Sequence, residues 1–188
     1  KKKDYNEFYK SISYDMDDPM DWIHSTAEGT IEFTVLFYIP KKAPADIYRA
    51  DYQPGVKLYV NRVFITDDDK ELLPTWLRFV KGVIDSSDLP LNVSREILQQ
   101  NRIMTKIRSN SVKKILDKIK TVSKNKDKYA GFYNEFGRLL KEGVYQEFEH
   151  KEALTELLRF KSTKEEGYIS LQDYVDRMDS DQKSIYYI

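Results

Sequence analysis

The spacing of apolar residues predicts a mixture of helices and strands. Residues 4–13 place apolar side chains at positions i, i+3, i+4 and i+7, the pattern of an amphipathic helix. Residues 30–39 instead alternate apolar and polar positions, and their far end is apolar on both faces. That pattern predicts a strand whose two faces are both covered. Residues 56–66 and 79–85 predict two more strands.

The second of these strands contains an irregularity. Its alternation slips between Val60 and Val63, which predicts a bulge or a tight hairpin at Asn61 and Arg62. A loop and a short helix are expected between this strand and the one that begins at residue 79. Strands interspersed with helical segments favour an α/β fold built in layers.

The second half of the chain is predominantly helical. From residue 94 to about residue 122 the apolar positions recur every three, four or seven residues, and a polar run at 99–102 indicates a break between a short and a long helix. Residues 127–160 predict two or three short helices. Glycines at three positions are expected to separate them: Gly131, Gly137 and Gly143.

The last segments combine a loop, a helix and a strand. Residues 161–167 are polar and predict a loop, and a helix is expected after it with Ser170 as its cap. Residues 184–188 are apolar and predict a final strand with unpaired edges. We expect this strand to pack on the helices, pair with another copy or be poorly ordered.

Composition narrows the classes of function. The 188 residues contain 31 basic and 31 acidic side chains, and a net charge of zero argues against a general polyanion binder. An aromatic content of 13% is typical of a chain that folds. The absence of cysteine excludes a disulfide scaffold, a thiolate zinc site and a cysteine nucleophile. No apolar run is long enough for a membrane span, so we expect a soluble, cytoplasmic protein.

The charge is sorted along the chain. Residues 1–94 carry 12 basic and 16 acidic side chains, whereas residues 94–128 carry 11 basic and 3 acidic ones. A basic helix over 102–128 could form a groove for nucleic acid. No aromatic residue lies between its charges to stack on bases, so a solvated helix face is the simpler interpretation.

Familiar catalytic motifs are missing. The sequence has no glycine-rich phosphate loop, no GxSxG elbow and no HExxH helix. Its two histidines, His24 and His150, are far apart, so neither a histidine triad nor a metal site is expected. Acidic pairs such as Asp67 and Asp68 lie in turn-like sequence and are interpreted as solvated carboxylates.

The one suggestive cluster lies within residues 88–104. Asn92 or Ser94 can cap the predicted helix, which places Arg95 in its first turn and Gln99 one turn later on the same face. A cation is unfavourable at the positive end of a helix dipole unless an anion compensates, and phosphates bind at such ends. From spacing alone, an exposed arginine beside a cap is the simpler interpretation.

At these residues the sequence resembles the middle domain of the 90-kilodalton heat-shock chaperone family. The similarity is greatest to the bacterial HtpG branch, and its longest stretch is LLPTWLRFVKGVIDSSDLPLNVSREILQQNRIM. The other similar segments occur in order along the chain: VKLYVNRVFITDD, LLRFKST, SLQDYVDRM and KSIYYI.

The resemblance implies one part of a dimeric, ATP-dependent chaperone of three domains. An N-terminal domain binds ATP with Mg, a middle domain assists hydrolysis and contacts client proteins, and a C-terminal domain dimerises. The present chain would therefore bind no cofactor and would not be an enzyme by itself. Its partners would be clients, its own two flanking domains and co-chaperones, with no membrane or nucleic acid. The implied parts are a larger α/β subdomain (1–126), a helical linker (127–160) and the truncated start of a smaller α/β subdomain (161–188).

The resemblance also assigns roles to individual residues. Arg95 matches the arginine that reaches the γ-phosphate of ATP held in the N-terminal domain, and Gln99 and Asn92 match neighbouring family positions. Phe64 matches an apolar residue that helps to dock the ATP domain. An ATP γ-phosphate would supply the anion that a first-turn arginine lacks.

The sequence gives less information about which residues contact client proteins. Exposed apolar side chains are the candidates, but aromatic residues also dominate protein cores. The candidates are Met16, Trp22, Ile23 and Trp76. Two alternatives stay open at this point: a nucleic-acid module that uses the basic helix 102–128, and a purely structural α/β domain in which Arg95 has no role.

Overall fold

A computed structural model describes residues 1–67, 72–90 and 101–188 of the chain. It divides the chain into two compact units, Lys1–Lys118 and Ile119–Ile188. The division into three parts expected at residues 126 and 160 stays a prediction. No helix in the described ranges is both long and apolar enough to cross a membrane.

The first unit is organised around a five-stranded mixed sheet. Its strand order is β1-β2-β5-β3-β4, and every neighbouring pair is antiparallel except β3 and β5. The strands are β1 (Asp21–Ala27), β2 (Phe33–Ile39), β3 (Gly55–Val60), β4 (Val63–Thr66) and β5 (Lys81–Ser86). The three strands predicted from alternation are confirmed as β2, the pair β3 and β4, and β5, each within a few residues of its predicted limits. The strand β1 was not predicted.

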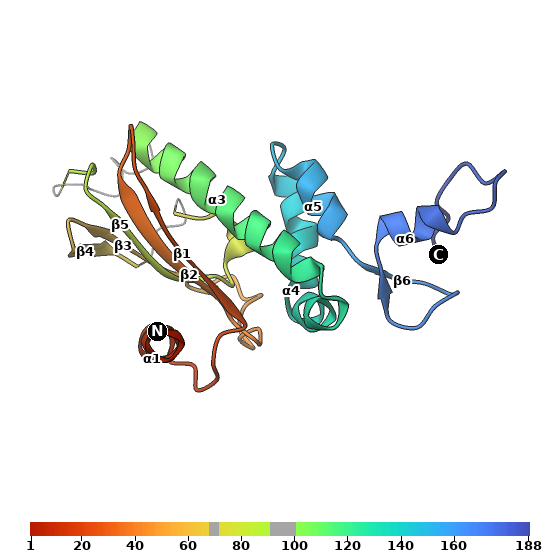
Figure 1. The fold of residues 1–188 in the computed structure, drawn as a ribbon, viewed down its shortest axis with the longest axis horizontal. Helices are drawn as coiled ribbons and strands as arrows, with labels where there is room; N and C mark the ends of the chain where they lie inside the picture. Colours follow the sequence, from red (N-terminus) through yellow and green to blue (C-terminus); the bar gives the residue numbers. More distant parts are fainter. Residues whose placement is uncertain (68–71, 91–100) are drawn as a thin grey trace. The chain divides into compact units, whose positions relative to one another are not determined.

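Helices cover the two faces of this sheet. Ser25 lies directly opposite Val35 and so shares its face, and the Lys114 ammonium of α3 (Arg102–Ser123) donates to the Ser25 Oγ at 2.7 Å. Tyr38 points to the other face, where its hydroxyl donates to the Tyr5 carbonyl of α1 (Lys2–Ser13) at 2.9 Å. Figure 1 shows α1 and α3 on opposite sides of the sheet. The predicted α/β layers are therefore confirmed.

The irregularity between Val60 and Val63 is a tight hairpin. Asn61 and Arg62 have positive φ angles of 49° and 66°, as both central residues of a type I′ turn do. The register also shifts beside Leu58, so the strand contains a bulge as well as the turn. The structure thus contains both the bulge and the tight hairpin that the sequence predicted as alternatives. The hairpin leads into β4, which lies at the edge of the sheet.

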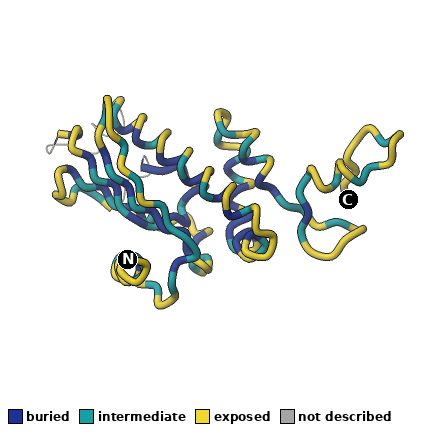
Figure 2. Tube along the Cα trace, in the orientation of Figure 1, coloured by how far each residue is buried: buried dark blue, intermediate teal, exposed yellow. Residues whose placement is uncertain are grey.

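The core of the first unit is apolar on both sides of the sheet. Figure 2 shows buried and intermediate residues along the central strands, with exposed residues at the loops. The short 3₁₀ helix Thr75–Leu77 confirms the helix expected after the second strand, and it buries two of its three side chains. The largest fully buried side chains of this unit are Trp76, Tyr9, Tyr38, Phe37, Phe79, Ile39, Ile47, Leu58 and Leu72.

The second unit is built on the helices α4 (Lys126–Gln146) and α5 (Lys151–Leu157). The prediction that glycines separate the helices of this region was wrong, because α4 runs through all three of them. A glycine costs about 1 kcal/mol relative to alanine inside a helix, but a long buried aromatic face outweighs that cost. That face consists of Tyr129, Phe132, Tyr133, Phe136, Leu139 and Leu140.

The end of the chain differs from the sequence prediction in two ways. The predicted loop lies inside a small hairpin, β6 (Phe160–Lys161) and β7 (Tyr168–Ile169). The helix α6 (Leu171–Asp176) is confirmed, and Ser170 caps it by a reciprocal pair of hydrogen bonds with Asp173. The strand predicted at 184–188 was wrong: these residues are irregular and exposed, and the described residues contribute no strand beside them.

Candidate functional site

The residues predicted to meet phosphate lie between β5 and α3 along the chain. Asn92, Arg95 and Gln99 fall outside the described residues, as does the helix start predicted at residue 94. Their roles therefore stay predictions. The described residues up to Pro90 and from Asn101 onward show how the chain enters and leaves this segment.

The chain leading into this segment is anchored to the sheet. The Asp88 carboxylate accepts a hydrogen bond from the Glu32 amide at 2.6 Å, and the Ser87 amide donates to the Glu32 carbonyl at 3.3 Å. Ser86, the last residue of β5, is fully buried. Hydrogen bonds to the loop before β2 thus fix the path of the chain just ahead of Pro90.

The helix α3, which comes after the segment, is tied to the same sheet by its basic side chains. Lys114 donates to Ser25, and Lys118 forms an ion pair with Asp21 of β1 at 3.1 Å, with both side chains less than a third exposed. These lysines hold α3 against the sheet. Two of the charges in the predicted basic face are therefore structural, which weakens the nucleic-acid interpretation of 102–128.

The edge strand β4 exposes an apolar pair. Val63 is 51% and Phe64 50% exposed, and the Phe64 ring meets Tyr59 of β3 edge to face at 5.7 Å between centroids. Phe64 is thus held by its neighbour while half of its surface remains open. This geometry suits a docking residue, because a positioned apolar side chain loses little entropy on contact. Val63 was not among the residues that the sequence predicted for docking.

The four candidate client contacts differ sharply in exposure. Met16 is 89% exposed. Trp22 and Ile23 are partly buried, and the Trp22 ring stacks on Tyr5 at 5.2 Å. Trp76 is fully buried in the core of the first unit, so its proposal as an exposed client contact was wrong. Its size and aromatic character serve packing instead.

Met16 sits on an ordered acidic turn after α1. The Tyr9 hydroxyl donates to the Asp15 carboxylate at 2.8 Å, and burial together with this carboxylate raises the pKa of Tyr9. Lys10 pairs with Asp18 at 2.9 Å, and this hydrogen bond lowers the pKa of the Asp18 carboxyl. These contacts fix the turn on both sides of Met16, which therefore projects from a defined position.

Comparison with known proteins decides the family. A family model described as Hsp90 protein matches residues 1–188. This chain belongs to the Hsp90 family. The resemblance noted from residues 72–104 is confirmed, and so is its HtpG character.

Two curated relatives of this Hsp90 chain are described as chaperone protein HtpG. The protein from Aliarcobacter butzleri is 64% identical over 190 residues, and that from Wolinella succinogenes is 61% identical over 189 residues. Each alignment covers the whole of this chain but only 30% and 31% of the respective relative. The chain thus spans about a third of the length of the curated relatives it matches.

A solved structure shows which third this is. The middle domain of a heat shock protein from Plasmodium falciparum matches with a TM-score of 0.88 and 32% identity, covering 100% of this chain and 74% of that one. The fold described above is therefore that of an Hsp90 middle domain. Among the described residues of this Hsp90 chain, no group of three or more His, Cys, Asp and Glu side chains could hold a metal ion.

Proposed function

We propose that this Hsp90 chain completes an ATPase whose nucleotide and Mg are held by a separate N-terminal domain. Arg95 reaches the γ-phosphate, and Gln99 and Asn92 position the segment that carries it. The observation that carries this proposal is the family match over the whole chain, which includes the stretch LPLNVSRE. The test is ATP turnover by the full-length protein with and without Arg95; this chain alone hydrolyses no ATP.

The assembly is inferred from the same family membership. The full-length protein is a cytoplasmic homodimer whose C-terminal domain joins the protomers, and client proteins and co-chaperones bind it. The chain described here supplies the γ-phosphate contact and part of the client surface. The arrangement over 1–126, 127–160 and 161–188 provides a larger subdomain, a helical linker and the start of a smaller subdomain.

Phe64→Ala is expected to weaken docking of the N-terminal ATP domain by about tenfold, because a half-buried aromatic ring at a contact carries about 1–2 kcal/mol. The measurement is calorimetric titration of this chain with the separately prepared N-terminal domain and a non-hydrolysable ATP analogue. Tyr145→Ala is the control, since this side chain is 93% exposed on the second unit. Equal affinities for wild type and Phe64→Ala would refute the docking role.

Met16→Ser is expected to lower affinity for an unfolded client about three- to tenfold, because it removes an exposed apolar contact without disturbing the core. Fluorescence anisotropy with a labelled, permanently unfolded protein measures this affinity. Tyr187→Ser, at a side chain that is 94% exposed, is the matched control for a general loss of exposed apolar surface. Equal losses in the two variants would contradict a specific site at Met16.

A further inference from the structure

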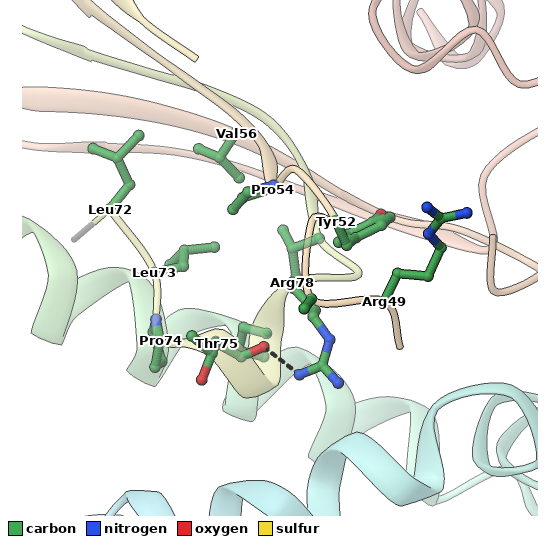
Figure 3. Close-up of a pocket in the computed structure, with 12 residues that line it drawn as sticks. Arg49, Tyr52, Pro54, Val56, Leu72, Leu73, Pro74, Thr75 and Arg78 are labelled. Atoms are coloured by element: carbon green, nitrogen blue, oxygen red, sulfur yellow. Dashed lines mark hydrogen bonds between the residues drawn. The ribbon is translucent and has the colours of Figure 1, made fainter. Parts of the chain in front are cut away.

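A cavity of about 180 Å³ lies in the first unit, bounded by residues 49–56 and 72–80. Figure 3 shows that its ends differ in chemistry. Leu72, Leu73 and Val56 stand at one end, and the side chains of Arg49 and Arg78 stand at the other. The cavity is therefore polarised, with apolar walls leading to two guanidinium groups.

The cationic end is built from groups whose positions are fixed. The Arg78 Nε donates to the Ile47 carbonyl at 2.8 Å, and its Nη1 donates to the Thr75 carbonyl at 2.9 Å. These bonds hold the guanidinium at the rim. The Arg78 guanidinium also lies 5.6 Å from the centroid of the Tyr48 ring.

The guanidinium of Arg49 already binds one carboxylate of this chain. The Arg49 guanidinium donates two hydrogen bonds, of 3.0 and 3.1 Å, to the Asp51 carboxylate, and both side chains are about 70% exposed. Solvent-exposed pairs of this kind contribute little stability. A carboxylate placed at the cavity mouth can therefore share or replace Asp51 at small cost, and the guanidinium fork is suited to it.

Tyr52 supplies a neutral donor at the same end. Its hydroxyl oxygen accepts a hydrogen bond from the Lys81 ammonium at 2.9 Å, so its own hydrogen is left to donate. Burial raises the pKa of Tyr52 to about 12, and the hydroxyl is accordingly protonated at neutral pH. The donor is thus polarised by an adjacent cation, which strengthens a bond to an anion.

We propose that this cavity is a binding site for a small monocarboxylate with an apolar body of about phenyl size. A dry cavity of about 150 Å³ accommodates benzene, so the volume here suits one ring and a short chain. The ring lies among the apolar walls at Val56 and Leu73, and the carboxylate meets Arg49 and Tyr52. The site is separate from the γ-phosphate role proposed for Arg95 and does not depend on it.

The test titrates the ¹⁵N-labelled chain with 3-phenylpropionate and follows amide shifts by NMR. We expect saturable shifts at Tyr52, Leu73 and Thr75 with a dissociation constant on the order of 1 mM, as for a ligand of this size. The alcohol 3-phenylpropan-1-ol has the same ring without the charge and is expected to bind about fivefold or more weakly. Absence of saturable shifts up to about 10 mM, or equal binding of the alcohol, would overturn the proposal.

Three variants locate the site. Arg49→Gln is expected to weaken binding about three- to tenfold, whereas Arg62→Gln removes the same charge at the far end of β3 and should leave it unchanged. Ala50 lines the cavity and is itself exposed, so Ala50→Trp should block binding without disturbing the core. Thermal unfolding confirms that each variant is folded. Equal effects of Arg49→Gln and Arg62→Gln would show attraction to general positive charge and refute the site.

Discussion

Arg95→Ala in the full-length protein is expected to lower ATP turnover about 10- to 100-fold while nucleotide affinity changes less than about twofold. An arginine that completes a phosphate site from outside can contribute about 10³–10⁵ in rate. The expected loss is smaller because domain closure, rather than chemistry, limits turnover in many gated enzymes. Under the proposed function, nucleotide affinity persists because a separate N-terminal domain, not this chain, holds the nucleotide and the Mg. Steady-state phosphate release and equilibrium nucleotide binding measure the two quantities.

The matched control for this experiment is Arg102→Ala. Arg102 begins α3, is exposed and belongs to the same basic stretch as Arg95. Its replacement removes one positive charge seven residues along the chain from Arg95 and is expected to change turnover less than about twofold. Arg95→Lys separates charge from geometry, since lysine retains the cation but loses the planar fork. Unchanged turnover in Arg95→Ala, or an equal loss in Arg102→Ala, would refute the role given to Arg95.

Side-chain periodicity predicted most of the fold because it reflects burial directly. The strand at Phe33–Ile39 alternates in the sequence and buries Phe33, Val35, Phe37 and Ile39 in the structure. The slip at Asn61 predicted the hairpin, since a two-residue turn interrupts alternation. The cap at Ser170 was also readable, because its partner three residues later completes a capping box.

The errors arise where long-range packing overrides local preference. Gly137 favours a helix end locally, yet it is buried within α4, and a β-carbon there would lie 2.7 Å from the Tyr133 ring. The glycine permits that ring to pack against the helix, which local sequence cannot reveal. The apolar residues 184–188 look like a strand, but a strand needs a hydrogen-bonded neighbour, and periodicity does not supply one.

The residues of the candidate site were proposed from family motifs. Physical properties of the sequence, such as spacing and residue type, predicted only part of the site. The exposure of Phe64 and Met16 could not be derived from composition, because any large apolar residue is more often buried. Trp76 shows the converse case. As a large aromatic residue it was a candidate client contact, but its side chain is fully buried in the core. The cavity beside Arg49 and Tyr52 had no sequence signal at all, because its walls come from two segments about twenty residues apart.

Gly82→Ala is expected to destabilise the first unit by at least about 3 kcal/mol, the largest stability effect that we predict. Gly82 lies on the central strand β5, opposite Phe37 of β2, with a φ of +146°. A β-carbon there would lie 2.1 Å from the Leu36 carbonyl oxygen, which is backbone and cannot move aside without breaking the β2–β5 pairing. The substitution therefore combines backbone strain with a steric clash in the middle of the sheet.

Gly29→Ala separates these two contributions. Gly29 has a similar φ of +139°, but a β-carbon there meets nothing within 4 Å, so only strain of about 1–3 kcal/mol is expected. Urea unfolding followed by tryptophan fluorescence gives both values, because the two tryptophans, Trp22 and Trp76, lie in the first unit with both glycines. If the clash dominates, the Gly82→Ala midpoint falls well below that of Gly29→Ala. Equal midpoints would mean that the β2–β5 pairing yields to the added methyl group, and that the sheet is held together by its covering helices rather than by its central register.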